Sequence, residues 1–284
     1  MVRYVAYILV TVIALVLAGS IAVVLGKGAV ACLAGRPAVY VTAFDGVGSV
    51  GGHPPRIRAM FEGPRGPRPL DSIWAVVRFR GGWIRWAYIN RQGLCHPHGP
   101  ADLPPGPHRF RVGLPEVHRR LDVVAHGTAW IWPRGCRVLW VDASALVPPG
   151  TGPAVGGDAA LPPASARAGL EALQALASPC RCVYLVADDA RGYAAARRRL
   201  KMWVAPAGPA FWVIPGRAYG RLNGLKGVWP RVCGAVVASD DLADAAGRLE
   251  VPVERLSAAG EDAPASPADR AWRRTLNRLT SRTR

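Results

Sequence analysis

The sequence is poor in lysine and in acidic residues, so its charge is strongly one-sided. Of its 36 basic residues, only three are lysine: Lys27, Lys201 and Lys226. The 36 basic residues exceed the 19 acidic residues, which gives a formal net charge of +17. The arginine excess, with abundant alanine, glycine and proline, is typical of a high-GC coding bias. A surface this positive still favours anionic partners such as lipid headgroups or phosphorylated ligands.

The chain also lacks recognisable nucleic-acid and zinc-binding patterns. It has no aromatic-basic run typical of RNA-binding domains and no Cys/His finger. Positive charge is then the only feature that favours nucleic-acid binding, and because charge alone is weak evidence, we do not expect a nucleic-acid partner. One residue separates Cys180 from Cys182, which is poor spacing for zinc. The scatter of the cysteines predicts small buried residues in a reducing compartment. The six cysteines are Cys32, Cys95, Cys136, Cys180, Cys182 and Cys233.

Residues 4–26 contain no charged side chain and are long enough to cross a bilayer as a helix. Arg3 and Lys27 bracket them, and the apolar run continues beyond the length of a usual cleaved signal peptide. The sequence therefore predicts an uncleaved transmembrane anchor over residues 1–28 and a single-pass membrane protein. The charges on the two sides of this segment nearly balance, so the positive-inside rule does not decide its orientation. The unpaired cysteines and the basic tail favour a cytoplasmic location for the rest of the chain.

Residues 35–133 read as a β-sandwich domain. Seven short strand-like runs, many separated by Gly/Pro-rich turns, predict an immunoglobulin-like sandwich. Residues 46–55 are among the predicted turns. The predicted strands are residues 38–44, 56–62, 73–79, 83–89, 108–113, 121–127 and 128–132.

Residues 134–258 alternate between buried strands and helices. This order predicts a doubly wound parallel sheet with its site at the carboxyl ends of the strands. Asp142 ends the first strand, so it lies where chemistry is expected. The predicted strands are residues 136–142, 180–188, 210–216 and 234–240, and the predicted helices are residues 165–178, 189–203, 221–232 and 241–249.

Acidic residues stand at the ends of several predicted strands: Asp142, then Asp188 and Asp189, then Asp240, Asp241 and Asp244. This pattern resembles the haloacid dehalogenase-like (HAD) superfamily of phosphohydrolases over about residues 134–250. The order of membrane segment, immunoglobulin-like sandwich and HAD-like domain is similar to that of some lipid-phosphatase-like relatives. The family has Asp-x-Asp after the first strand: a nucleophile that also binds magnesium, then a general acid/base. The resemblance makes Asp142 the nucleophile. Ser144 replaces the acid/base, although its backbone carbonyl could still bind the metal.

The other family motifs are partly present. Val186, or Ala187 if the register shifts, stands where the family has a phosphate-binding Ser or Thr, and neither has a hydroxyl. The resemblance assigns Lys226 to neutralising the nucleophile and the phosphate, and Asp240 and Asp244 to holding Mg²⁺. The alternatives are that Lys226 is an exposed helical lysine and that Asp240 or Ser239 only caps a helix.

These residues predict a membrane-anchored, HAD-like protein with a degenerate phosphohydrolase site. Loss of the acid/base, which contributes about 10²- to 10⁴-fold, indicates a binding or scaffold module with weak or no catalysis. The alternative is an active Mg²⁺-dependent phosphatase or phosphotransferase acting on a lipid or another bulky phosphate ester. The short segments between motifs indicate no cap domain and an open site.

Residues 259–284 read as a basic tail that follows a linker-like run. Ser266 and Pro267 predict the start of a helix. Trp272, Leu276 and Leu279 share one of its faces, and arginines fill much of the rest. This pattern favours an interfacial helix for anionic lipid, and a solvated tail is the alternative.

Overall fold

The computed structural model describes the chain from residue 39 onward, with gaps. By backbone contacts the chain divides into two units, Met1–Val39 and Tyr40–Arg284. All the helices and strands described below belong to the second unit. The described residues are 39–63, 66–67, 74–115, 124–146, 162, 164–176, 180–214, 216–256, 272, 274, 277 and 278.

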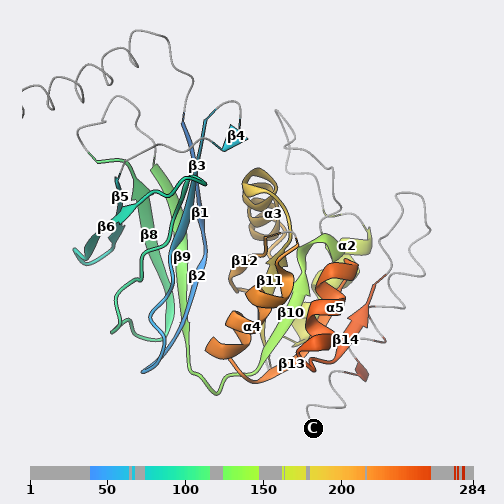
Figure 1. Ribbon diagram of the computed structural model, residues 1–284. Helices are drawn as coiled ribbons and strands as arrows, with labels where there is room; N and C mark the ends of the chain where they lie inside the picture. The colour runs from blue at the N-terminus through green and yellow to red at the C-terminus, as the bar shows by residue number, and fades with distance from the viewer. Residues whose placement is uncertain are drawn as a thin grey trace, which may run out of the picture. The chain divides into compact units, whose positions relative to one another are not determined.

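Two β-sheets are formed by the part of the chain before residue 133 (Figure 1). Sheet A has the order β1-β3-β4, with β7 also paired to β3, and sheet B has the order β2-β9-β8-β5-β6. The strands of sheet A are β1 (Tyr40–Phe44), β3 (Arg58–Gly63), β4 (Gly66–Pro67) and β7 (Leu94–Cys95). Those of sheet B are β2 (Gly46–Ser49), β5 (Trp74–Phe79), β6 (Ile84–Tyr88), β8 (Gly106–Gly113) and β9 (Val124–Trp132).

Two glycine-containing segments differ from the sequence prediction. Residues 46–49, expected in a turn, form the buried strand β2, and the two strands expected over 121–127 and 128–132 are one strand, β9. A Cβ on Gly48 would lie 2.8 Å from the His53 carbonyl oxygen, and a Cβ on Gly127 would overlap the Phe110 ring. Gly48 therefore permits close packing inside a strand rather than marking a turn, and Gly127 does so rather than marking the end of a strand.

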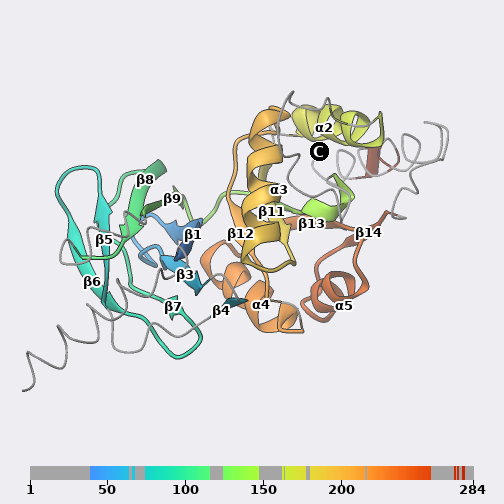
Figure 2. The ribbon, with the colours of Figure 1, turned by 90° about the horizontal axis from the view of Figure 1, so that it is seen from above.

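The second half of the chain forms a five-stranded sheet in which every pairing is parallel. Its strand order is β12-β11-β10-β13-β14, and helices cover both faces, α2 and α3 on one and α4 and α5 on the other (Figure 2). The predicted alternation of strands and helices is present, and β14 is an addition to it. The strands are β10 (Val138–Asp142), β11 (Arg181–Val186), β12 (Ala210–Trp212), β13 (Val232–Val237) and β14 (Val253–Arg255). The helices are α2 (Ala164–Leu176), α3 (Ala190–Met202), α4 (Ala218–Val228) and α5 (Asp240–Arg248).

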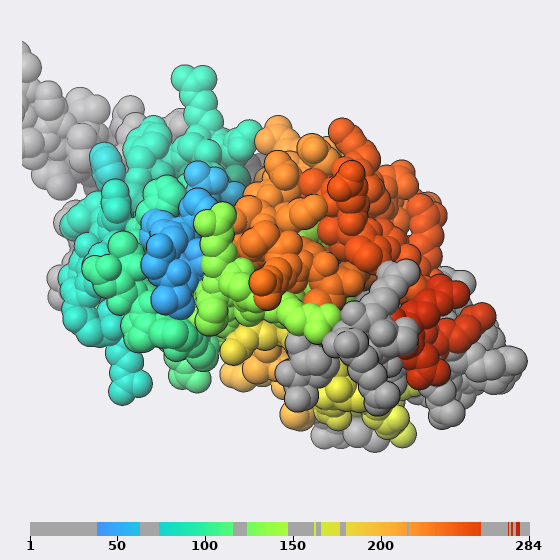
Figure 3. All heavy atoms as spheres, turned by 90° about the horizontal axis from the view of Figure 1, so that it is seen from below, coloured from blue at the N-terminus to red at the C-terminus, as the bar shows by residue number. Residues whose placement is uncertain are grey.

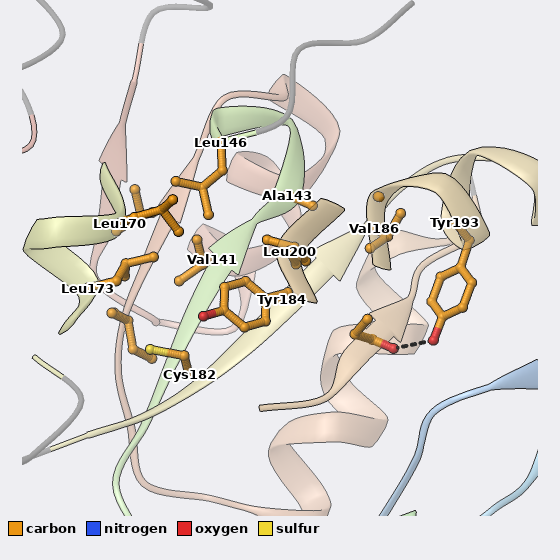
Figure 4. Close-up of a cluster of buried hydrophobic side chains, with 14 of the residues drawn as sticks. Val141, Ala143, Leu146, Leu170, Leu173, Cys182, Tyr184, Val186, Tyr193 and Leu200 are labelled. Carbon is orange, nitrogen blue, oxygen red and sulfur yellow. Dashed lines mark hydrogen bonds between the residues drawn. The ribbon is translucent and has the colours of Figure 1, made fainter. Parts of the chain in front are cut away.

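Strand β10 is buried along its whole length, which explains its continuous apolar sequence. Leu139 and Val141 pack in the cluster on the α2–α3 side, part of which Figure 4 shows. Val138 and Trp140 pack in the cluster on the α4–α5 side. A strand covered on both faces reads as an unbroken apolar run, and Asp142 is the polar residue at its end.

Asp45 lies where the chain passes from β1 in sheet A to β2 in sheet B. Its buried carboxylate accepts hydrogen bonds from the amides of Thr128 at 3.0 Å and Ala210 at 3.1 Å, and it pairs with Arg197 at 2.8 Å. The Tyr193 hydroxyl accepts from the Asp45 amide and donates to the Ala210 carbonyl, the bond dashed in Figure 4. Burial raises the pKa of Asp45, and Arg197 and the amides act against that rise. The Asp45 cluster thus joins sheet B, β12 and α3.

A second contact between the two halves lies beside α4. The Trp229 indole donates to the Gly48 carbonyl at 3.2 Å and stacks on Trp132 with 4.5 Å between ring centroids. The blue β1–β2 segment and the orange α4 segment lie on the face seen in Figure 3. Aromatic stacking combined with a satisfied indole N–H makes this contact favourable.

The predicted fold class, which began with a transmembrane helix, is corrected. No helix in the described part of the chain is long and apolar enough to cross a membrane. Helices α2 and α3 have 13 residues each, about 20 Å of helix against a bilayer core of roughly 30 Å. Residues 4–26, where the anchor was predicted, lie outside the described residues.

Part of the predicted tail packs against the α/β sheet's helices. Trp272 is 2% exposed and belongs to the α2–α3 cluster, and a Cβ on Gly169 of α2 would meet its indole ring. Arg278 pairs with Glu254 at 2.9 Å. The apolar face predicted for lipid therefore has its tryptophan in the protein core, while Ser266, Pro267, Leu276 and Leu279 lie outside the described residues.

Candidate functional site

Asp142 lies at the carboxyl end of β10, as predicted, and is 1% exposed. One carboxylate oxygen accepts from the Ser144 amide at 2.9 Å and the Ser144 hydroxyl at 2.6 Å. The other accepts from the amides of Ala238 and Ser239, both at 3.0 Å. Four donors therefore surround the carboxylate, and it links the ends of β10 and β13.

Ser144 belongs to a short 3₁₀ turn, Ala143–Ala145, and Asp142 is its N-cap. The serine side chain points back to the Asp142 carboxylate rather than outward. At the position where the HAD resemblance expects a proton donor, the residue thus supplies a hydroxyl hydrogen bond to the predicted nucleophile. This contact holds the carboxylate in place and satisfies its charge locally.

Lys226 is on α4, and its ammonium donates to the Leu249 carbonyl at 2.6 Å. Leu249 is the C-cap of α5, so the lysine stabilises the carbonyl end of that helix. The hydrogen bonds of Asp142 come from Ser144, Ala238 and Ser239, and Lys226 is not among them. The structure does not join the predicted nucleophile to the predicted lysine.

Asp240 and Asp244 lie in α5, and both pair with Arg255 of β14, at 2.8 Å and 3.2 Å. Their side chains are 87% and 75% exposed, so they face solvent while Asp142 is buried. The hydroxyl of Ser239 caps α5 by accepting from the Leu242 amide at 3.3 Å. The capping alternative is therefore present, supplied by Ser239.

The predicted magnesium ligands do not converge. Both oxygens of Asp142 already face N–H or O–H donors, and a cation there would displace them. In the part of the chain that the structure describes, no group of three or more His, Cys, Asp and Glu side chains could hold a metal ion. The residues present do not fit Mg²⁺ in this arrangement, and Mg²⁺ binding stays a prediction from the resemblance.

The end of β11 also lacks a phosphate-binding hydroxyl. Val186 is 3% exposed and packs in the α2–α3 cluster. The next polar residues act on backbone groups: the Asp189 carboxylate caps α3 by accepting from the Gly192 amide at 2.7 Å, and the Asp188 carbonyl accepts from the Trp212 indole at 2.8 Å. The region is a well-bonded strand end.

Sequence reasoning missed Glu62, a 7% exposed carboxyl on β3. Among the described residues its buried Oε2 makes no hydrogen bond, and it lies 3.9 Å from Nε of Arg191 at the start of α3. Burial raises the pKa of Glu62, the charge of Arg191 acts against that rise, and nearby Asp189 adds to it. Its place next to Gly63 and a predicted Gly/Pro turn gave no sequence signal for burial.

A second missed feature is the exposed face of sheet B. Trp74, Trp86 and Tyr88 are each more than half exposed, and Trp74 contacts Tyr88 edge-to-face at 5.8 Å between centroids. Single exposed aromatics are ordinary, but contiguous ones mark binding surfaces. The residues that define this exposed face are Trp74, Arg78, Ile84, Trp86, Tyr88, Arg109, Arg111, Val124 and His126.

The strand register arranges this face in rows. Ile84, Arg78, Arg111 and His126 stand opposite one another across β6, β5, β8 and β9. In the next row Trp86 stands opposite Val76, and Val76 opposite Gly113, which has no side chain. Directly opposed residues of antiparallel strands share a face. A basic row therefore runs beside an aromatic platform.

Comparisons with known proteins give little guidance. No family model matches the chain. No curated protein matches it. An amylomaltase structure from Corynebacterium glutamicum is similar at 12% identity and a TM-score of 0.21, over 50% of this chain and 20% of the amylomaltase. A carbohydrate acetylesterase structure from Xanthomonas citri is similar at 11% identity and a TM-score of 0.32, over 87% of this chain and 74% of the esterase.

The chain thus spans about a fifth of that amylomaltase. Neither TM-score is high enough to support an argument about fold or activity. The HAD resemblance consequently stays a prediction.

Proposed function

We propose that this protein is a binding module with no phosphohydrolase activity at Asp142, and that it binds a phosphorylated ligand on the exposed face of sheet B. The observation that supports the non-catalytic part is the hydrogen bonding of Asp142. Its carboxylate is surrounded by four donors, whereas a nucleophile needs a free oxygen directed at the substrate. Here the carboxylate stabilises the fold.

The remaining predicted residues agree with this proposal. Lys226 is bonded to Leu249, and Asp240 and Asp244 are paired with Arg255 in solvent. Catalysis of phosphoryl transfer depends mainly on positioning and charge stabilisation around the phosphorus. Because these side chains are bonded to different partners, they cannot together position a phosphoryl group and stabilise its charge.

The exposed face of sheet B has the chemistry for a ligand that joins a phosphoryl group to a planar ring. Trp74, Trp86 and Tyr88 offer stacking surfaces, and Arg78 and Arg111 lie in the row next to that of Trp86. Arginine binds phosphate oxygens through a planar fork of donors, and rings stack on exposed aromatics. The net charge of +17 attracts anionic ligands to the whole surface.

Calorimetric titration with a nucleoside monophosphate, the matching nucleoside and inorganic phosphate tests the binding part. We expect the monophosphate to bind best and added salt to weaken it. Trp86→Ala and Arg111→Ala should each weaken binding about tenfold, which corresponds to about 1.4 kcal/mol. Arg85→Ala is the matched control, because Arg85 is exposed on the opposite face of β6. Equal losses in all three variants would refute the assignment of this face.

Aryl phosphate hydrolysis tests the non-catalytic part. We expect no turnover with or without Mg²⁺, and no increase in melting temperature on adding Mg²⁺. Hydrolysis that Asp142→Asn abolishes while Asp241→Asn leaves it intact would establish the alternative, a working Mg²⁺-dependent phosphatase. Asp241 is a suitable control because it is exposed in the first turn of α5 and has no predicted ligand role.

A further inference from the structure

Two cysteines far apart in the sequence meet at the amino-terminal end of the parallel sheet. Cys180 directly precedes β11, and Cys233 is the second residue of β13, on the other side of β10. Their sulfur atoms are 3.2 Å apart, with the Cys180 thiol donating to the Cys233 sulfur. This is the opposite end of the sheet from Asp142, so the pair is independent of the site described above.

A bulge directs Cys233 toward this meeting point. Val138 of β10 pairs with Val232, but the next residue, Leu139, pairs with Gly234. Cys233 is therefore the extra residue of β13, and bulges of this kind re-aim a side chain and are frequent next to functional sites. Cys180 lies just outside β11 and Cys233 lies in the bulge. Neither cysteine is therefore held in place by regular hydrogen bonding between paired strands.

Arg137 supplies positive charge at the same point. Its guanidinium Nε donates to the Cys233 sulfur at 3.3 Å. The hydrogen bond from Cys180 and the charge of Arg137 lower the pKa of Cys233, while the same thiol contact and burial raise the pKa of Cys180. Cys233 is partly exposed and Cys180 is buried. Cys233 is therefore both the more accessible and the more acidic thiol of the pair.

The other described cysteines have different surroundings. Burial raises the pKa of Cys95 and of Cys182 to about 12 in each case. Cys136 is partly exposed like Cys233, but burial raises its pKa as well. Thiolate character governs reactivity toward oxidants and alkylating agents. Reactivity is thus directed to Cys233, and Cys136 is a natural internal control.

We propose that Cys233 and Cys180 form a redox-active pair in which Cys233 reduces a hydroperoxide and Cys180 resolves the product to a disulfide. The Cys233 thiolate attacks the terminal peroxide oxygen, the O–O bond breaks, and the departing alkoxide takes a proton to become an alcohol. Cys233 is then a sulfenic acid. Cys180 gives up its proton and attacks the Cys233 sulfur, an S–S bond forms, and hydroxide leaves as water.

The overall change balances: two thiols and one hydroperoxide give one disulfide, one alcohol and one water. Two electrons pass from the thiols to the peroxide. The sulfur atoms must approach by about 1.2 Å, from their present separation to a bond length of about 2.05 Å. An added dithiol would reverse the reaction by exchange through a mixed disulfide.

Peptide mapping of the full-length reduced chain after treatment with hydrogen peroxide tests the pair. We expect the intact mass to fall by two hydrogens and the Cys180 and Cys233 peptides to be linked until dithiothreitol is added. In Cys180→Ser a sulfenic acid at Cys233 should persist and react with dimedone. Cys136→Ser should leave the linkage unchanged. Absence of the 180–233 linkage under oxidation that modifies Cys136 would overturn the proposal.

Iodoacetamide labelling of the wild-type chain provides a readout that needs no variant to fold. At slightly acidic pH Cys233 should be alkylated at least about tenfold faster than Cys136, because the thiolate is the reacting form. Arg137→Gln should remove much of this difference, and Arg137→Lys should restore part of it. Equal labelling rates for Cys233 and Cys136 in the wild type would show that the two sulfurs are only packed together, and the proposal would fail.

Discussion

Replacing Asp142 with alanine distinguishes a structural carboxylate from a retained nucleophile. The change leaves three amides, those of Ser144, Ala238 and Ser239, without the acceptor that they have now. The Ser144 hydroxyl also loses its partner, although it can rotate toward another acceptor. The perturbation therefore acts on the link between β10 and β13 and on the turn that follows β10.

The size of the effect can be worked out from these contacts. A hydrogen bond to a charged group contributes about 1.5–3 kcal/mol, and an unsatisfied buried donor costs about 1–3 kcal/mol. Water can reach some of the three amides at the sheet edge once the side chain is gone, so the full sum is not expected. We expect Asp142→Ala to lower the free energy of unfolding by about 3–5 kcal/mol.

Urea denaturation followed by circular dichroism measures this loss. Asp142→Asn keeps one acceptor oxygen for Ala238 and Ser239 but presents an amide group to the Ser144 N–H, so we expect a loss of about 2 kcal/mol. Ser144→Ala removes only the hydroxyl bond and should cost about 1 kcal/mol. The loss in the free energy of unfolding should therefore be largest in Asp142→Ala, smaller in Asp142→Asn and smallest in Ser144→Ala.

An unchanged or increased stability in Asp142→Asn would refute this reasoning. Residues kept for function are often strained or poorly compensated, and their replacement commonly stabilises the fold. A stabilised Asp142→Asn variant would therefore indicate that the carboxylate is retained for binding or chemistry. Together with loss of aryl phosphate hydrolysis, that result would favour the phosphatase alternative.

Two further variants test particular packing and charge features. Burial raises the pKa of Glu62 above 4.5, so the stability that its neutral form contributes is complete below pH 4.5 and is lost as pH rises through the raised pKa. Glu62→Gln should therefore raise the melting temperature near neutral pH and leave it unchanged below pH 4.5, and a fall near neutral pH would contradict burial as the dominant cause. Gly127→Ala places a methyl group in the space of the Phe110 ring and should cost about 1–3 kcal/mol in urea denaturation. Gly135→Ala, where nothing lies within 4 Å of the added Cβ, should be neutral, and equal losses in both would contradict the packing argument.

The sequence predicted the α/β half well because its strands are buried on both faces. β10 is apolar from Val138 to Val141 and ends on Asp142, so its carboxyl end could be read directly, although it begins two residues after the predicted start at residue 136. The sequence was less informative about β2 and β9. Gly48 was predicted in a turn and Gly127 at the end of a strand, but each is a point inside a strand where another group occupies the place of a side chain. Distinguishing the two roles requires knowledge of what packs there.

The candidate site could be located but not assembled from the sequence. Strand ends placed Asp142 and Asp240 on the same edge of the sheet, which follows from parallel topology. The directions of the side chains depend on neighbours that were not foreseen. Arg255 belongs to β14, which was not predicted, and it pairs with Asp240 in solvent. Lys226 faces the end of α5 because of how α4 packs against that helix.

The Asp45 cluster has a consequence for how this architecture can be inherited. Its carboxylate lies in the crossing between sheets A and B, yet it is satisfied by Ala210 of β12 and Arg197 of α3. Recombination that exchanged the β-sheet half for an unrelated sandwich would leave Arg197 and the Ala210 amide facing a foreign surface. The reverse exchange would leave a buried carboxylate without its cation, which is strongly unfavourable. We therefore expect the two halves to be inherited together, and neither half to occur joined to an unrelated domain.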